Sequence, residues 1–317
     1  MTSTLERPPA EAGPPPAPRT PGPRSTRSEG WVRRAPLLPA LVFTIIITQI
    51  PFLLTIFYSL QSWNLVRPGS QQFVWFENYV SVFADSQFRG VALNTVVMTV
   101  GSVLVAVVLG MVLALLLNRH FVGRGVVRTL LVTPFLITPV AAALLWKTTL
   151  LDPTYGLVNF LLSPFGVGDV AWTSSYPLVS VMVALIWQWT PFMMLLLLAG
   201  LQSMPSDQIE AARMDGAGAW AIFRELTLPH LRRFIELGTV LGAIYLVNTF
   251  DAVYMITQGG PGTASANLPY YIYQRAFLGF DIGQSAAMGV VVVVMTIIVA
   301  TFALRLVFTS FGAAEEN

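Results

Sequence analysis

Four long stretches of this chain contain no charged side chain, and they limit its fold more than any other feature. No Asp, Glu, Lys or Arg occurs in residues 35–66, 90–118, 170–206 and 282–304. A helix that crosses a bilayer needs about 20 apolar residues, because about 30 Å of hydrocarbon is crossed at about 1.5 Å per residue. Only 11% of the chain is charged, against about 25% in soluble domains. The pattern therefore indicates an all-α, polytopic membrane protein.

Apolar runs place six transmembrane helices in the chain. The predicted spans are 36–60, 91–117, 127–150, 178–201, 235–256 and 285–308. Residues 1–34 are rich in Pro, Ser, Arg and Gly and cannot bury enough surface to offset their ordering entropy, so we expect a disordered tail there and a transmembrane domain over 35–312. Gly238 and Gly242 form a small-xxx-small pattern, which predicts close helix packing.

Basic residues are divided unequally between the two sides of these spans. With an even number of spans, 14 basic residues fall on the side of the N-terminus and 4 on the opposite side. Because cytoplasmic loops carry the excess of Lys and Arg, we expect the N- and C-termini to be cytoplasmic.

Several kinds of chemistry are excluded by residues that the chain lacks. It has no cysteine, which excludes thiolate metal sites and cysteine nucleophiles. His120 and His230 have no carboxylate partner nearby in sequence, so we expect no metal site. The phosphate loop G-x-x-x-x-G-K-[ST] is absent, and the one lysine, Lys147, follows Leu and Trp rather than glycines. The chain cannot hydrolyse ATP by that route, and we expect no cofactor within it.

The predicted cytoplasmic loop, residues 202–233, is the most densely charged part after the N-terminal tail. Ser203 or Ser206 suits the N-cap of a first short helix. Gly216 supplies a turn, and a second short amphipathic helix follows until Pro229 stops it. By pattern alone, this pair of helices is either a hairpin that lies on the membrane surface or a docking surface for a partner.

The residue string of this loop favours the docking surface. It reads Glu-Ala-Ala-Arg-Met-Asp-Gly-Ala over 210–217, and Phe223, Leu226, Leu228 and Pro229 follow. This string resembles the EAA loop of ABC-importer permeases, in which the loop forms coupling helices that insert into a cleft on the ATPase subunit. The coupling residues that the resemblance implies are Glu210, Ala211, Ala212, Asp215, Gly216 and Ala217.

A second string resembles the carbohydrate-uptake branch of the same family. It comprises Phe-Asp-Ala-Val-Tyr at 250–254, Thr-Gln-Gly-Gly-Pro-Gly-Thr at 257–263 and Tyr-Ile-Tyr-Gln-Arg-Ala-Phe at 271–277. Its glycines by themselves indicate an ordinary external turn, because Gly adopts positive φ. The similarity to maltose, glycerol-phosphate and polyol permeases implies that this loop lies under an extracytoplasmic solute-binding protein.

Polar side chains inside the predicted spans are costly to bury and often mark a substrate pathway. Gln188, Tyr245, Asn248 and Asp251 are candidates, because a sugar or polyol needs hydrogen-bonding partners and aromatic faces for its C–H surface. Asn94 is a further candidate. A packing role stays open for each, since Tyr also forms interfacial belts and Asn and Gln also join helices.

The resemblance implies an import system of several subunits in a bacterial cytoplasmic membrane. This chain would be its permease rather than an enzyme, paired with a second, different permease. Two ATP-binding subunits would supply ATP and Mg²⁺, and an extracytoplasmic binding protein would deliver a sugar, polyol or similar solute. Nucleic acid has no place in such a system.

Two other classes of membrane protein fit the sequence less well. A secondary transporter or channel would need ion-coupling carboxylates inside the spans, where the sequence offers only Asp251, near an end. A membrane enzyme would need a cluster of His, Asp, Glu or Ser at one depth, and the sequence contains none.

Overall fold

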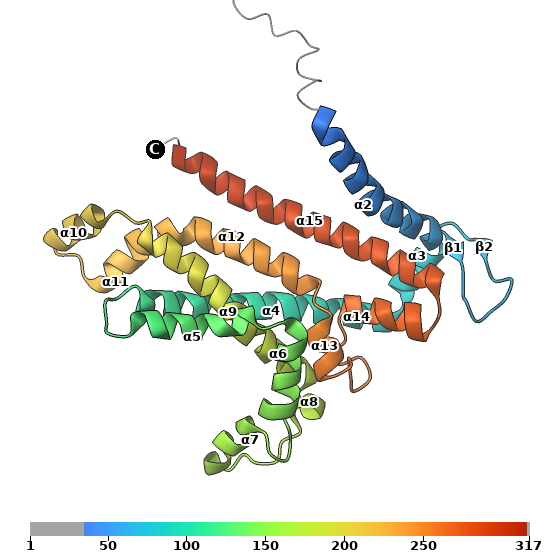
Figure 1. Cartoon of the computed structure of the whole chain (residues 1–317), viewed down its shortest axis with the longest axis horizontal. Coiled ribbons are helices and arrows are strands. Elements are labelled where there is room, and N and C mark those ends of the chain that lie inside the picture. Colours follow the sequence, from blue (N-terminus) through green and yellow to red (C-terminus); the bar gives the residue numbers. More distant parts are fainter. Residues whose placement is uncertain (1–34, 316–317) are drawn as a thin grey trace, which may run out of the picture. The chain divides into compact units, whose positions relative to one another are not determined.

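The computed structural model describes residues 35–315, which are almost entirely helical (Figure 1). The predicted disordered tail, 1–34, lies outside the described residues. The chain divides into two compact units, residues 1–52 and 53–317. Helix α2 (Leu38–Ser59) begins in the first unit and ends in the second.

The turn η1 (Ala35–Leu37) precedes α2. All the remaining described elements, which are helices, short helical turns and two strands, belong to the second unit. Strands β1 (Gln61–Ser62) and β2 (Gln72–Phe73) pair antiparallel. The α-helices are α3 (Glu77–Ala84), α4 (Ser86–Leu117), α5 (Arg124–Leu136), α6 (Pro139–Leu145), α7 (Leu157–Leu162), α8 (Trp172–Ser175), α9 (Pro177–Gln202), α10 (Ser206–Met214), α11 (Ala219–Ile222), α12 (Leu228–Val247), α13 (Asp251–Ile256), α14 (Leu268–Tyr273) and α15 (Ile282–Glu315). The turn η3 (Ser163–Phe165) is 3₁₀, and η2 (Trp146–Leu150), η4 (Phe223–Thr227) and η5 (Gln274–Leu278) are π-helical.

Helix α2 is apolar along its whole length and contains no charged residue. Its most apolar stretch has no buried side chain, and Phe43 and Leu53 are at least 60% exposed. A helix of this length that is apolar on all sides is typical of a segment surrounded by lipid.

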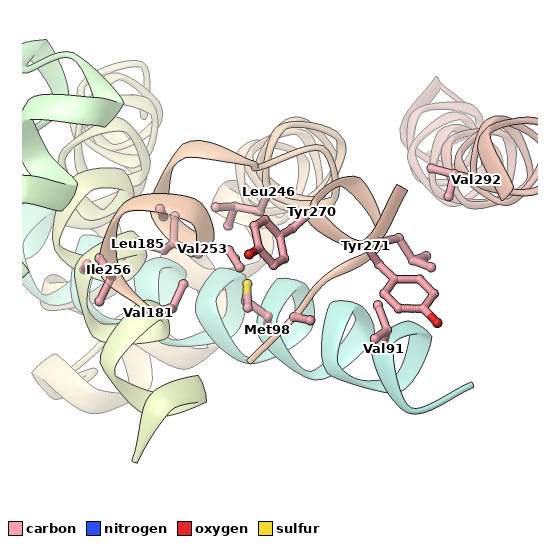
Figure 2. Packing of buried hydrophobic residues seen from close by; sticks show 14 of the residues in the cluster. Val91, Met98, Val181, Leu185, Leu246, Val253, Ile256, Tyr270, Tyr271 and Val292 are labelled. Carbon is pink, nitrogen blue, oxygen red and sulfur yellow. The ribbon is translucent and has the colours of Figure 1, made fainter. Parts of the chain in front are cut away.

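Helices α4, α9 and α12 pack against one another in the second unit, and α15 packs on α12. Their buried side chains form the main core, in which Met98, Leu185 and Leu246 lie close to Val253 of α13 (Figure 2). A Cβ at Gly110 would lie 2.7 Å from the Met193 Cβ, so only glycine permits this approach of α4 to α9.

The glycines of α12 pack as the sequence predicted. A Cβ at Gly238 would lie 3.0 Å from side-chain atoms of Leu196 and Met193, and one at Gly242 would lie 2.6 Å from the Met193 Cε. The predicted role of this glycine pair in close packing is therefore confirmed.

The structure confirms the predicted all-α fold, with several helices that are candidates for membrane spans. Helices α2, α4 and α9 are long and apolar enough to cross a bilayer, and α5 with α6 and η2 gives a fourth crossing if this bent pair is one span. Helices α12 and α15 occupy the last two predicted spans. Within the described residues, neither contains a stretch that is as long and apolar as a membrane crossing requires. The count of six spans stays a prediction.

Two predicted spans are not continuous helices. The span 127–150 is divided into α5 and α6, whose axes differ by 101°. The span 235–256 is divided into α12 and α13, with residues 248–250 between them. Each predicted span therefore contains a break, and both breaks lie at the candidate site.

Candidate functional site

The four predicted pathway residues line one cavity of about 350 Å³. The volume lies within the usual range for small-molecule sites. Gln188 comes from α9, Tyr245 from α12, Asn248 from the segment after α12, and Asp251 begins α13. The structure therefore brings together residues that the sequence separates by up to 63 positions. Sequence reasoning missed several further lining residues, including Phe135, Ile137 and Thr249.

Both helix breaks face this cavity. Ile137 lies between α5 and α6, Thr249 lies between α12 and α13, and both residues line the cavity. Irregular backbone at membrane depth is tolerated where protein or a water-filled cavity satisfies its polar groups. The Nε2 of Gln188 donates to the Ile137 carbonyl at 3.1 Å, and the Nδ2 of Asn267 donates to the Thr249 carbonyl.

Aromatic rings form one wall of the cavity. The Trp189 ring lies 5.3 Å from the Tyr245 ring and 5.7 Å from the Phe135 ring, measured between centroids. Tyr245 is 61% exposed, so part of its ring is free to meet a ligand. Such a wall suits the C–H surface of a sugar or polyol.

Polar side chains also contribute to the lining. The Asn248 Nδ2 donates to the Ile244 carbonyl at 2.8 Å, which leaves its side-chain oxygen as an acceptor. Within residues 35–315, no hydrogen bond or ion pair engages the carboxylate of Asp251, which is half-buried. Amide and carboxylate oxygens accept hydrogen bonds from hydroxyl groups, so the cavity combines acceptors with aromatic faces.

Asn94 lies outside this cavity and holds the loop after α13. Its Nδ2 is 2.9 Å from the Thr263 carbonyl and 3.3 Å from the carbonyls of Ala264 and Ala266. The loop is further held by the buried Ser265, whose hydroxyl donates to Thr257 at 2.8 Å. The structure thus supports a packing role for Asn94 and shows a hydrogen-bonded loop at 257–267.

A polar cluster ties the start of α4 to α14 and η5. Arg275 pairs with Asp85 at 3.0 Å, and the buried Tyr271 hydroxyl donates to the same carboxylate at 2.9 Å. Burial acts to raise the pKa of Asp85. The effect of burial is outweighed by hydrogen bonds from the Gln87 backbone and the Tyr271 hydroxyl, together with the positive charge of Arg275. The pKa of Asp85 therefore lies below its ordinary value of 3.8. We call the side chains of Asp85, Tyr271 and Arg275 the Asp85 cluster.

The predicted coupling loop forms two helices joined by a tight turn. Gly216 has a φ of +84°, and its N–H donates to the Arg213 carbonyl at 3.1 Å. The N–H of Ala217 donates to the Ala212 carbonyl at 2.9 Å. This pair of hydrogen bonds is a Schellman motif, in which a glycine with positive φ ends a helix. The predicted turn at Gly216 is therefore confirmed.

The surface of this loop is open to a partner. Glu210, Ala211, Asp215 and Gly216 are exposed, while Ala212 and Ala217 are half-buried. Met214 is 88% exposed. We call residues 206–222 the α10–α11 hairpin.

The serine cap predicted for the first helix is absent. Pro205 occupies the N-cap position of α10 and makes no side-chain cap bond. Ser203 instead donates its hydroxyl to the Gly200 carbonyl at 2.8 Å, at the end of α9. Ser206 bonds its neighbour Asp207. Both hydroxyls are thus engaged elsewhere.

The sequence predicted that Pro229 stops the second short helix, and this prediction was wrong. The chain passes from α11 through the π-turn η4 into α12, and Pro229 lies in the first turn of α12. The Leu228 N–H donates to the Phe223 carbonyl, five residues back. This wider turn accommodates a proline, which has no N–H of its own to donate.

Residues 106–309 match the family of binding-protein-dependent transport system inner membrane components. The chain belongs to this family. It is therefore a permease of the ABC-transporter class and a multi-pass membrane protein, as the resemblance implied. The matched range contains both the cavity and the α10–α11 hairpin.

Relatives of this permease extend the match over most of the chain. It is 34% identical to the sulfoquinovosyl glycerol transport system permease protein of Agrobacterium fabrum, covering 86% of this chain and 89% of that protein. It is 33% identical to the trehalose/maltose transport system permease protein of Thermococcus litoralis, covering 82% and 88%. A crystal structure of a bacterial alginate ABC transporter, in complex with an alginate pentasaccharide-bound periplasmic protein, has the same fold, with a TM-score of 0.75, 24% identity, and coverage of 87% and 93%.

Proposed function

We propose that this permease is the transmembrane subunit of an ATP-driven, binding-protein-dependent importer of a sugar, polyol or related hydroxylated solute. The observation that carries the proposal is the cavity of about 350 Å³, whose lining combines aromatic rings with amide and carboxylate oxygens. The names of the trehalose/maltose and sulfoquinovosyl glycerol relatives support this solute class. The alginate transporter supports an extracytoplasmic binding protein as a partner.

The chain's connectivity supports coupling of this cavity to a partner ATPase. The α10–α11 hairpin is bracketed by α9, which carries Gln188, and by α12, which carries Tyr245. From the cavity to the hairpin these helices run about 20–25 Å at about 1.5 Å per residue. A push on the hairpin would thus move two helices that line the cavity, and Glu210 and Asp215, which are exposed, would contact the ATPase.

The proposed assembly has four further subunits. Two ATP-binding subunits, carrying ATP and Mg²⁺, bind this hairpin and its counterpart on a second, different permease. An external binding protein delivers the solute. Closure of the ATP-binding subunits drives the permease pair from an inward-open to an outward-open state, with both termini of this chain in the cytoplasm.

The test is ATPase activity in proteoliposomes that contain the permease, its candidate partner subunits and the binding protein. Each member of a panel of sugars and polyols is added in turn. We expect one hydroxylated solute to stimulate ATP hydrolysis. If an assembled complex responds to none of them, the solute class is wrong; if no complex assembles, the coupling role of the hairpin is wrong.

A further inference from the structure

A groove of about 820 Å³ follows α4 toward the α10–α11 hairpin, separate from the cavity described above. Its floor consists of side chains of α4, among them Val108, Met111, Val112 and Leu115. Val108 is 61% exposed and Val112 is 49% exposed, so the described residues of the second unit leave these two side chains of the floor uncovered.

Two stacked aromatic rings form a side of the groove. The rings of Trp220 and Phe223 lie 5.6 Å apart at an interplanar angle of 28°. Trp220 is 72% exposed although it is a large apolar side chain. Tryptophan in membrane proteins is concentrated at the level of the lipid headgroups, which places this end of the groove at the membrane surface.

The same end of the groove carries positive charge. Arg119, just past the end of α4, and Arg213 of α10 both line it, with the Asn118 amide beside them. None of the described residues that line the groove is acidic. Among the described ion pairs, neither arginine has a carboxylate partner. The charges are therefore available to an anion.

The length of the groove matches one leaflet of a bilayer. From Val107 to Arg119 the chain rises about 18 Å along α4, at about 1.5 Å per residue. Half of the hydrocarbon core of a bilayer is about 15 Å thick. An acyl chain laid on the apolar floor would therefore place its headgroup between the two arginines.

We propose that this groove binds an anionic phospholipid, with one acyl chain along α4 and the phosphate at Arg119 and Arg213. Basic pockets between membrane helices bind such headgroups through charge. The lipid fills a surface that the described residues of the second unit leave open. It also joins the end of α4 to the α10–α11 hairpin, since Arg213 belongs to the hairpin and Arg119 does not.

The experiment uses the full chain in nanodiscs that contain phosphatidylglycerol with a photoreactive acyl chain. Labelled peptides are identified by mass spectrometry. We expect labels on the α4 floor and near Trp220, and less labelling by phosphatidylcholine with the same acyl chain. The Arg119→Gln/Arg213→Gln variant should lose labelling by roughly tenfold or more, because each basic residue near anionic lipid contributes about fivefold.

Matched variants separate this site from general charge. Arg128→Gln/Arg224→Gln removes two exposed arginines that do not line the groove, and should label like the wild type. Val112→Trp keeps both arginines but fills the floor, and should also lose labelling. The thermal unfolding midpoint of each variant reports whether it is folded. Equal labelling by the two lipids, or full labelling in both groove variants, would overturn the proposal, and so would a groove covered by another protein segment.

Discussion

Gly216 is the residue whose backbone conformation gives the α10–α11 hairpin its turn. Its φ of +84° lies in the left-handed region, and a Cβ added there would meet no atom within 4 Å. Glycine is therefore required at this position by the backbone conformation and not by a lack of space for a side chain. Sequence reasoning predicted this turn correctly, because a glycine after a helical segment has a known structural meaning.

Replacing Gly216 with alanine should weaken binding of the ATP-binding subunit. An L-residue in the left-handed region costs about 1–2 kcal/mol, so we expect at least about fivefold less co-purifying subunit. Gly218→Ala is the matched control, since Gly218 has a φ of −72° and equally open surroundings. Equal co-purification with the two variants would contradict the role of the turn.

Gln188 holds the carbonyl at the break between α5 and α6. Gln188→Leu would leave the Ile137 carbonyl without this donor, which costs about 1–3 kcal/mol for a buried group. We expect a lower thermal unfolding midpoint in detergent. Gln202→Leu, at the exposed end of α9, should leave the midpoint unchanged. If both variants melt like the wild type, Gln188 does not support the break.

At the scale of elements, composition and periodicity predicted where the helices lie but not where they break. Pro134 and Pro139 flank the 101° break, but the carbonyl of Ile137 at the break is bonded by Gln188 from a different helix. The π-turn at 223–227 has no local sequence signature, because it depends on how α11 and α12 are joined. Breaks and wide turns are decided by tertiary partners, which a single sequence does not display.

The polar residues of the candidate site could be predicted from the sequence, but the cavity that they form could not. Gln188, Tyr245, Asn248 and Asp251 stand out because polar groups in apolar spans are costly. Their meeting in one cavity depends on α9 and α12 packing together and on both breaks. The sequence offered no comparable sign for Phe135 or Ile137, which are ordinary apolar residues in an apolar segment.

The Asp85 cluster should make the tie between α4 and α14 depend on pH. Folding lowers the pKa of Asp85 below 3.8, so its carboxylate stabilises the folded chain above that value and loses the effect as pH falls through the folded pKa. At pH 6 we expect Asp85→Asn to lower the free energy of unfolding by about 1 kcal/mol. The difference from wild type should shrink below about pH 3.8.

Chemical denaturation at several pH values checks this dependence. Asp169→Asn removes the same charge from an exposed position outside the cluster, and should behave like the wild type throughout. A constant difference between Asp85→Asn and wild type from pH 6 to pH 3 would show that the charge of Asp85 is not what stabilises this contact.

At the scale of the whole molecule, the chain has a ligand-sized cavity at the middle of α9 and the C-terminal end of α12, and an exposed hairpin between the end of α9 and the start of α12. Helices α9 and α12 join them without a flexible linker, apart from the short segment 203–205 and the wide turn η4 (Figure 1). In the function proposed above, the hairpin would set whether the ATPase binds, and the cavity would set which solute passes.

The most direct test of this account is the rate of solute uptake by proteoliposomes with the cavity variants Asn248→Ala and Asp251→Asn. Uptake is measured with a saturating amount of loaded binding protein, using the solute that stimulates ATP hydrolysis. We predict that each variant assembles with its ATPase as the wild type does but loses uptake by about tenfold or more, as expected when a hydrogen-bonding partner of the solute is removed. Wild-type uptake by both variants in an assembled complex would contradict the claim that this cavity is the solute site.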